Sequence, residues 1–195
     1  MLFEVEIKVC LKQDLEATKA KLRKLGSKYQ ANIDHVDDYF LLPGGLRNFA
    51  KTDEALRVRE TIKNGVKEGA DITYKGKKLG STTKTRQEIV VEISSAEKME
   101  EILLNIGLRK AFSLKKWREI YTCEFENENI TITLDRVEYL DAQYMEVELT
   151  ARSQQEIEEK EGILIRFLYH LGYSKQDSIR ASYLELVLQK LNVKF

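Results

Sequence analysis

Two kinds of hydrophobic spacing alternate along the chain. In four segments apolar residues recur every three or four positions, as they do on one face of a helix, and a glycine follows each of the first three segments. The capping-box pattern, a serine followed three residues later by glutamate, marks the start of the second segment at Ser94 and of the third at Ser153. The spacing predicts helices at about residues 14–25, 95–106, 154–171 and 177–191.

Elsewhere polar and apolar residues alternate with the period of two that is typical of β-strands. Turn-forming residues such as Asn64-Gly65 and Asn127-Glu128-Asn129 separate these segments. The alternation predicts strands at about residues 2–10, 34–42, 54–62, 69–76, 84–93, 110–125, 129–137 and 143–150. The fold class is therefore α+β, in a single domain spanning residues 1–195, because no linker-like segment divides the chain.

The polar face of these strands is almost entirely charged. In the first strand Glu4, Glu6 and Lys8 share one face, and apolar residues share the other. One explanation is an ordinary sheet with one face in water. However, a solvated face usually mixes charged residues with Ser, Thr, Asn and Gln, and the apolar helices need a surface to cover. Both features favour a closed barrel with the apolar strand face outward under helices and the charged face inward.

A charged barrel interior requires compensation, because an isolated buried charge is costly. The acids belong to the first and last predicted strands, which are neighbours in a closed barrel, so they would form one wall. Carboxylate oxygens suit Mg²⁺ or Mn²⁺. Lysine and arginine on the other walls suit phosphate, because the guanidinium fork matches its oxygens. The pattern indicates a site for a polyphosphate and a divalent metal.

Composition narrows the classes of partner. The 195 residues include 32 Lys or Arg and 32 Asp or Glu, so net charge provides no attraction for nucleic acid or for an anionic membrane. No apolar run has the length of a membrane span, and charges at Glu4 and Glu6 interrupt the first apolar residues. Cys10 and Cys123 are expected to be free thiols in a reducing compartment. We expect a cytoplasmic protein, monomeric or homodimeric, that binds neither nucleic acid nor membrane.

Seven short motifs, in order, resemble the CYTH family, which includes class IV adenylyl cyclases and thiamine triphosphatases. The first is the Glu-x-Glu-x-Lys pattern of residues 4–8. The others that match are Arg57-Val58-Arg59, Thr73-Tyr74-Lys75, Arg86-Gln87-Glu88, Lys116-Trp117-Arg118, Leu134-Asp135 and Glu146-Val147-Glu148. Ser182-Tyr183-Leu184-Glu185-Leu186 resembles the C-terminal helix of the cyclase-like branch. The resemblance covers nearly the whole chain.

The resemblance implies a closed antiparallel eight-stranded β-barrel, the triphosphate tunnel, with helices packed outside. It implies Mg²⁺ or Mn²⁺ as cofactor, bound by Glu4, Glu6, Asp135, Glu146 and Glu148. It implies phosphate binding by Lys8, Arg57, Arg59, Lys75, Arg86, Lys116 and Arg118. It also assigns catalytic roles to Lys8, Arg59 and Arg118.

The site motifs leave the reaction open. The leading interpretation is conversion of ATP to cyclic AMP and pyrophosphate. The alternative is a triphosphatase acting on tripolyphosphate, thiamine triphosphate or a nucleoside triphosphate, and a third is a polyphosphate or nucleotide binder without activity. The difference is expected at the tunnel mouth, where the loop at 76–83 and the segment 173–183 are candidates. In some members of the family that the sequence resembles, a C-terminal base closes the tunnel, and either Lys175 or Arg180 would match it.

Overall fold

The computed structural model describes residues 3–79 and 85–193, and it confirms the predicted closed antiparallel barrel. Lys84 and residues 80–83 of the loop predicted at 76–83 lie outside these described residues. The strands are β1 Phe3–Cys10, β2 Lys28–Leu41, β3 Ala55–Lys63, β4 Val66–Lys75, β5 Arg86–Ile93, β6 Arg109–Phe125, β7 Glu128–Val137 and β8 Gln143–Ala151. The predicted strands agree closely, except that β2 begins six residues earlier than expected.

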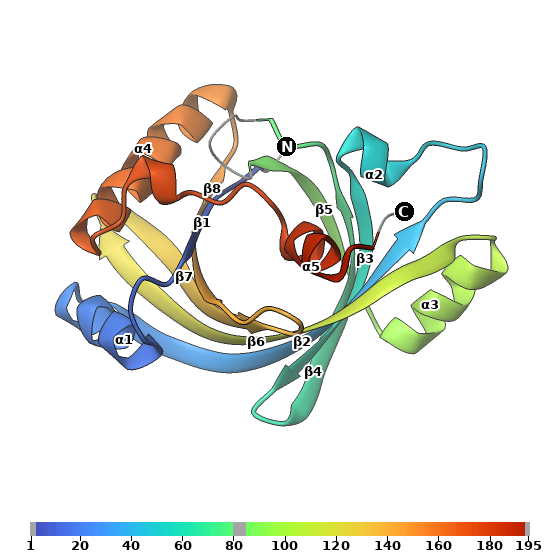
Figure 1. The fold of residues 1–195 in the computed structure, drawn as a ribbon, viewed down its shortest axis with the longest axis horizontal. Helices are drawn as coiled ribbons and strands as arrows, with labels where there is room; N and C mark the ends of the chain where they lie inside the picture. Colours follow the sequence, from blue (N-terminus) through green and yellow to red (C-terminus); the bar gives the residue numbers. More distant parts are fainter. Residues whose placement is uncertain (1–2, 80–84, 194–195) are drawn as a thin grey trace.

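The barrel order is β1-β5-β4-β3-β2-β6-β7-β8 (Figure 1). Strands β1 and β8 pair along their whole lengths, from Phe3 opposite Ala151 to Cys10 opposite Tyr144, which confirms that the first and last strands are neighbours. Within the described part of the chain, the other edge of β1 meets β5 over two residue pairs. The charged residues of β1 and β8 therefore share one continuous wall of the interior.

The helices are α1 Leu15–Lys24, α2 Phe49–Thr52, α3 Ala96–Asn105, α4 Gln154–His170 and α5 Tyr183–Leu191, with a short 3₁₀ helix at Lys175–Asp177. Ser153 caps α4 as predicted, by accepting a hydrogen bond from the Glu156 N–H. The cap of α3 was placed wrongly: Ser95, not Ser94, accepts the bond from the Lys98 N–H. The one-turn helix α2 was not predicted, because four residues show no helical period.

The main hydrophobic core lies outside the barrel, between the strands and helices α1 and α4 (Figure 1). Val5, Ile7 and Val9 of β1 point into it and are at most 2% exposed, so their charged neighbours point inward, as predicted. Strand β5 departs from this pattern. Ile89 and Val91 were expected to lie under a helix, but they are 50% and 54% exposed because α3 covers β3, β4 and β6 instead.

The fourth predicted helix is two separate elements. Instead of one helix from residue 177, an extended segment follows the 3₁₀ helix, and in it the Ile179 N–H donates to the Lys8 carbonyl. The chain then enters α5, where Ser182 and Glu185 form a capping box. Tyr183 and Val187 of α5 pack against Leu114, Val137 and Tyr144 at one end of the barrel. Figure 1 shows α5 within the ring of strands.

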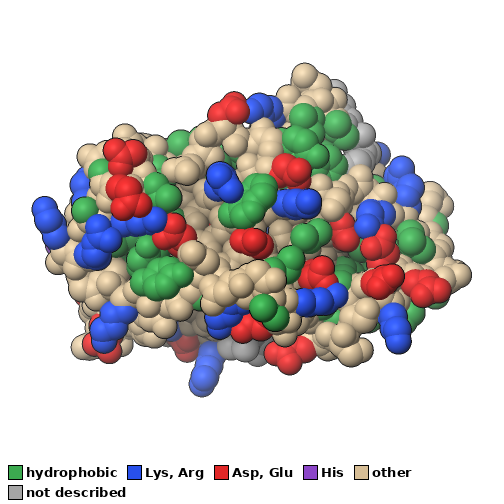
Figure 2. Space-filling model, turned by 90° about the horizontal axis from the view of Figure 1, so that it is seen from below, with side chains coloured by type: hydrophobic (Ala, Val, Ile, Leu, Met, Phe, Trp, Pro, Cys, Tyr) green, Lys and Arg blue, Asp and Glu red, His purple; other side chains and the backbone are tan. Residues whose placement is uncertain are grey.

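The outer surface carries both signs of charge in close alternation. Figure 2 shows Lys and Arg side chains interspersed with Asp and Glu on one face, without a large area of one sign. This distribution agrees with the equal numbers of acidic and basic residues. Among the described residues, no helix has both the length and the apolar character needed to cross a membrane.

Candidate active site: a charged tunnel

A cavity of about 440 Å³ occupies the barrel interior, within the size range of small-molecule sites. Every strand of the barrel except β7 contributes residues to its lining, and so do α2 and α5. Its charged lining residues are Glu4, Glu6, Asp37, Asp53, Glu54, Arg57, Arg59, Asp71, Lys75, Arg86, Glu88, Lys116, Arg118, Glu146, Glu148 and Glu185. The alternation of the strands therefore concentrates acids and bases around one space.

Carboxylates from β1 and β8 form one wall of this cavity. Glu6 lies directly opposite Glu148 in the strand pairing, and like charges in that position repel each other. Burial, and then the charge of Glu6, raise the pKa of Glu148 to about 7. Burial, and then Glu148, also raise the pKa of Glu4. The carboxylates of this wall are therefore buried and lie close enough to one another for their charges to interact.

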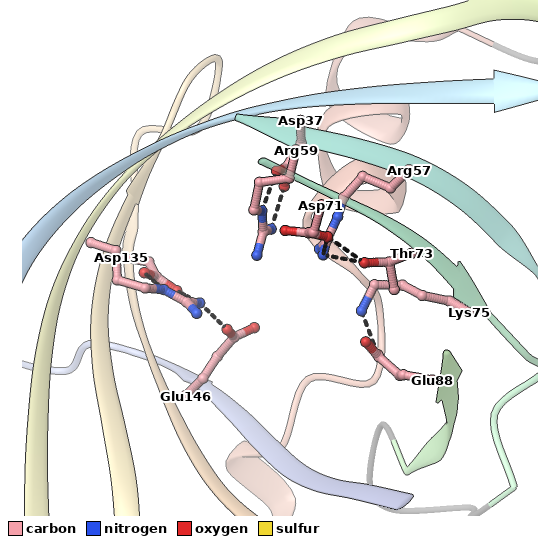
Figure 3. A network of polar contacts seen from close by, with 10 residues as sticks. Asp37, Arg57, Arg59, Asp71, Thr73, Lys75, Glu88, Asp135 and Glu146 are labelled. Carbon is pink, nitrogen blue, oxygen red and sulfur yellow. Dashed lines mark hydrogen bonds and ion pairs between the residues drawn. The ribbon is translucent and has the colours of Figure 1, made fainter. Parts of the chain in front are cut away.

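Arginines of β3 face the cavity from another wall (Figure 3). The Arg59 guanidinium donates two hydrogen bonds to Asp37 of β2, at 2.5 and 2.6 Å. Burial acts to raise the pKa of Asp37, but the charges of Arg59 and Arg57 outweigh it and hold that pKa well below its usual range. Arg57 donates to Thr73 at 2.9 Å and lies 3.3 Å from Asp71. Among the described residues, its buried Nε has no hydrogen-bond partner.

Arg118 of β6 links two acids that the sequence pattern assigned to the metal. It donates to both oxygens of Asp135, at 2.7 and 2.6 Å, and also to Glu146. Asp135 accepts a further bond from the Tyr183 hydroxyl at 2.8 Å. Asp135 is 2% exposed and does not line the cavity, so in this structure it holds Arg118 in place from behind.

The remaining bases differ in how they meet the cavity. Lys75 forms an ion pair with Glu88 of β5, whereas Arg86 lies 4.0 Å from Asp53. Burial, followed by the positive charges of Arg118 and Arg59, lowers the pKa of Lys116 to about 7.

Helix α5 covers two lysines of the tunnel. Lys8 is fully buried; its Nζ donates to the Ala181 carbonyl at 2.6 Å and lies 3.9 Å from the centre of the Tyr183 ring. The Lys116 Nζ lies 5.5 Å from the same ring. Tyr183 therefore screens both cations with its aromatic face, and Lys8 does not line the cavity.

The profile of the CYTH domain family matches residues 2–183 of this chain. The chain belongs to the CYTH family. The match spans every strand of the barrel and ends at the first residue of α5. The family resemblance seen in the sequence motifs is thereby confirmed.

Relatives of this CYTH protein have similar lengths. "Putative adenylate cyclase MJ0240" of Methanocaldococcus jannaschii is 38% identical over 188 residues, which cover 95% of this chain and 98% of the relative. The solved structure of the PH1819 protein from Pyrococcus horikoshii OT3 is 36% identical, with a TM-score of 0.83 over 96% of this chain and 99% of that one.

A more distant solved structure shares the fold alone. It is described as "Putative adenylyl cyclase HpAC1 from Hippeastrum" with a dominant triphosphatase activity. It is 15% identical, with a TM-score of 0.66 over 100% of this chain and 98% of that one.

Ten of the twelve residues predicted for the CYTH site line the cavity, the exceptions being Lys8 and Asp135. Sequence reasoning missed Asp37 and Asp71, which neutralise the β3 arginines, and Tyr183, which covers the lysines. Only the alternation of His35, Asp37 and Tyr39 on one strand face pointed to Asp37. The closing bases suggested by sequence, Lys175 and Arg180, do not line the cavity.

The carboxylate wall suits a metal that is shared with a phosphate ligand. Within residues 3–79 and 85–193, no three Asp, Glu, His or Cys side chains are gathered closely enough to hold an ion by themselves. However, Mg²⁺ is commonly held by one or two carboxylates together with water and substrate phosphate oxygens. Glu6 and Glu148, with Glu4 beside them, offer such oxygens on one wall of the cavity.

Proposed function

We propose that this CYTH protein is a divalent-metal-dependent enzyme that acts on a triphosphate inside the tunnel, with ATP converted to cyclic AMP and pyrophosphate as its leading reaction. One observation carries the proposal: the carboxylates of β1 and β8 and the guanidinium groups of β3 and β6 line a single cavity. A polyphosphate needs both, because its own charge requires cations and its metal requires oxygen ligands.

The arginines would bind and orient the phosphate chain. Arg57 and Arg59 on β3, and Arg118 on β6, approach the cavity from different sides and can hold separate phosphate oxygens through their planar forks. Glu6, Glu148 and Glu4 would hold Mg²⁺ or Mn²⁺. A bound ion of this kind neutralises charge on the phosphate oxygens and favours departure of pyrophosphate.

In the cyclase reaction the 3′-hydroxyl oxygen of ATP forms a bond to the α-phosphorus. The bond from that phosphorus to the bridging oxygen of pyrophosphate breaks, and the hydroxyl proton passes to solvent. Holding both ends of one molecule in line makes the attack intramolecular, which favours ring closure over attack by water. The contribution of Arg59 and Arg118 would be to fix the phosphate chain in that alignment.

Product analysis tests the reaction. The protein is incubated with ATP and Mg²⁺ or Mn²⁺, in parallel with tripolyphosphate, and the products are separated by chromatography. Cyclic AMP with an equal amount of pyrophosphate is expected from ATP. ADP and orthophosphate without cyclic AMP would refute the cyclase proposal but leave the tunnel assignment intact.

A triphosphatase is the second candidate, because the charged part of the cavity is sufficient to hold an inorganic triphosphate. Water would attack the terminal phosphorus, and orthophosphate would be released from tripolyphosphate in the same assay. A binder without activity would instead be stabilised thermally by tripolyphosphate and Mg²⁺ with no product from either compound.

A further inference from the structure

We infer, on the basis of the function proposed above, that the site takes a triphosphate bearing an organic group such as a nucleoside, and that this group lies in an apolar subsite between α2 and α5. The subsite is defined by Tyr39, Ala55, Ala111, Leu184 and Leu188, all of which line the cavity.

Strand pairing places the three strand residues of this subsite at one end of the barrel. Tyr39 of β2 lies opposite Arg57 of β3 and opposite Phe112 of β6. Ala55 lies two residues before Arg57, and Ala111 lies directly before Phe112. The strand order β6-β2-β3 makes these positions neighbours across adjacent strands.

A β-bulge accounts for the position of Ala111. The pairing of β2 with β6 shifts between Tyr39 opposite Phe112 and Phe40 opposite Lys110, so Ala111 has no partner in the ladder. A bulge redirects the side chain of its extra residue, here toward the cavity. Both Ala111 and Ala55 are small, and they leave room where a larger side chain would fill the space.

Helix α5 supplies the facing surface. Tyr183 and Val187 are buried against the barrel, and the next face of the helix presents Leu184 and Leu188, one turn apart, to the cavity. Both leucines are half-buried.

An ion-pair cluster fixes α5 at the tunnel mouth. The Lys78 Nζ lies 2.7 Å from Asp53, which directly follows α2, and 3.0 Å from both carboxylate oxygens of Glu185 on α5. The Lys78 side chain is only 6% exposed. The apolar surface of α5 is therefore held opposite α2 as part of the folded structure.

The chemistry of the subsite distinguishes two classes of ligand. Inorganic tripolyphosphate carries only charged oxygens and gains nothing from apolar walls. An organic group that covers Tyr39, Leu184 and Leu188 removes apolar surface from water, which favours binding. The charged part of the cavity holds phosphates for either ligand, so the subsite should affect affinity for the organic triphosphate alone.

Two cavity variants and one control test this separation. Ala111→Phe fills the subsite, and Leu188→Gln makes it polar while keeping a good helix former. Leu191→Gln is the matched control, because Leu191 is 40% exposed on the same helix and does not line the cavity. Affinities for methylene-bridged analogues of ATP and of tripolyphosphate, which resist turnover, are measured with Mg²⁺ by titration calorimetry.

We expect the unaltered protein to bind the ATP analogue more tightly than the tripolyphosphate analogue. Ala111→Phe should lower the affinity for the ATP analogue at least tenfold, and Leu188→Gln should lower it severalfold, as one or two lost apolar contacts imply. Both variants should keep the affinity for the tripolyphosphate analogue within about twofold of that of the unaltered protein. Leu191→Gln should change neither affinity.

Equal affinity of the unaltered protein for the two analogues would overturn the proposed subsite. An equal loss of affinity for both analogues in Ala111→Phe would overturn it as well. Either result would leave the proposed phosphate site standing. Failure of the unaltered protein to bind either analogue would instead overturn the proposed function together with the subsite.

Discussion

Replacement of Asp37 by asparagine should cost far more stability than loss of an equivalent ion pair on the surface. Asp37 accepts both hydrogen bonds from the Arg59 fork, and the side chains of Asp37 and Arg59 are 4% and 13% exposed. Asp37→Asn leaves the buried guanidinium without a negative partner. Removal of one partner from a buried pair costs about 3–5 kcal/mol in the free energy of unfolding. At about 2–4 °C per kcal/mol for a chain of this size, the melting temperature should fall by roughly 6–20 °C.

The chain offers a matched control for this measurement. Arg166 donates to both oxygens of Glu126 in the same forked geometry, but their side chains are 53% and 39% exposed. Exposed pairs contribute little because water already solvates both charges. Glu126→Gln should therefore leave the melting temperature nearly unchanged.

Two further measurements make the test specific to charge. The double variant Asp37→Asn, Arg59→Gln should recover much of the lost stability, because no unpaired charge remains. Tripolyphosphate with Mg²⁺ should raise the melting temperature of Asp37→Asn by more than that of the unaltered protein, since phosphate then provides the missing anion for Arg59. Equal losses in Asp37→Asn and Glu126→Gln would refute the reasoning.

Two other predictions concern the tunnel walls. Glu148→Gln should abolish metal-dependent turnover, because a ligand of the proposed metal is lost. Calorimetry without metal should nevertheless give a melting temperature equal to or above that of the unaltered protein, because repulsion from Glu6 is relieved. Full activity of this variant would exclude the metal assignment. Arg57→Lys should keep the fold, as circular dichroism would show. It should lose most of the thermal stabilisation by tripolyphosphate and Mg²⁺, because an ammonium group lacks the planar fork. Unchanged stabilisation would show that Arg57 does not bind phosphate.

The strand periodicity, together with apolar helices that need a surface to cover, favoured a closed barrel, and the resemblance to the CYTH family implied its eight antiparallel strands. The same reasoning placed Glu6 and Glu148 on one wall, since closure makes the first and last strands neighbours, and the structure pairs them directly. The partner of Arg59 was not predictable in this way. Asp37 is 22 residues away, and only the register of β2 against β3 brings the two opposite each other.

Near the end of the chain, two sequence patterns disagreed about where the last helix begins. Ser182 and Glu185 have the spacing of a capping box, which marked the true start of α5. The apolar spacing that begins at Ile179 suggested an earlier start. However, the Ile179 N–H donates a hydrogen bond to the Lys8 carbonyl, and this tertiary contact keeps the segment before α5 extended. The place of Tyr183 over Lys8 follows from that contact and has no signal in the sequence.

The ion pairs of the tunnel mean that ligand binding is an exchange of partners. Arg118 holds Asp135 and Glu146, and Arg59 holds Asp37. Under the proposed function, each of these carboxylates would compete with phosphate for its guanidinium group. If phosphate displaced Glu146 from Arg118, that carboxylate would become available as an additional oxygen ligand for the proposed metal, beside Glu148. Phosphate would thereby create the metal site, and metal bound there would stabilise the displaced carboxylate. Linkage requires the two effects to be equal in free energy, so metal and triphosphate should raise each other's affinity by the same factor.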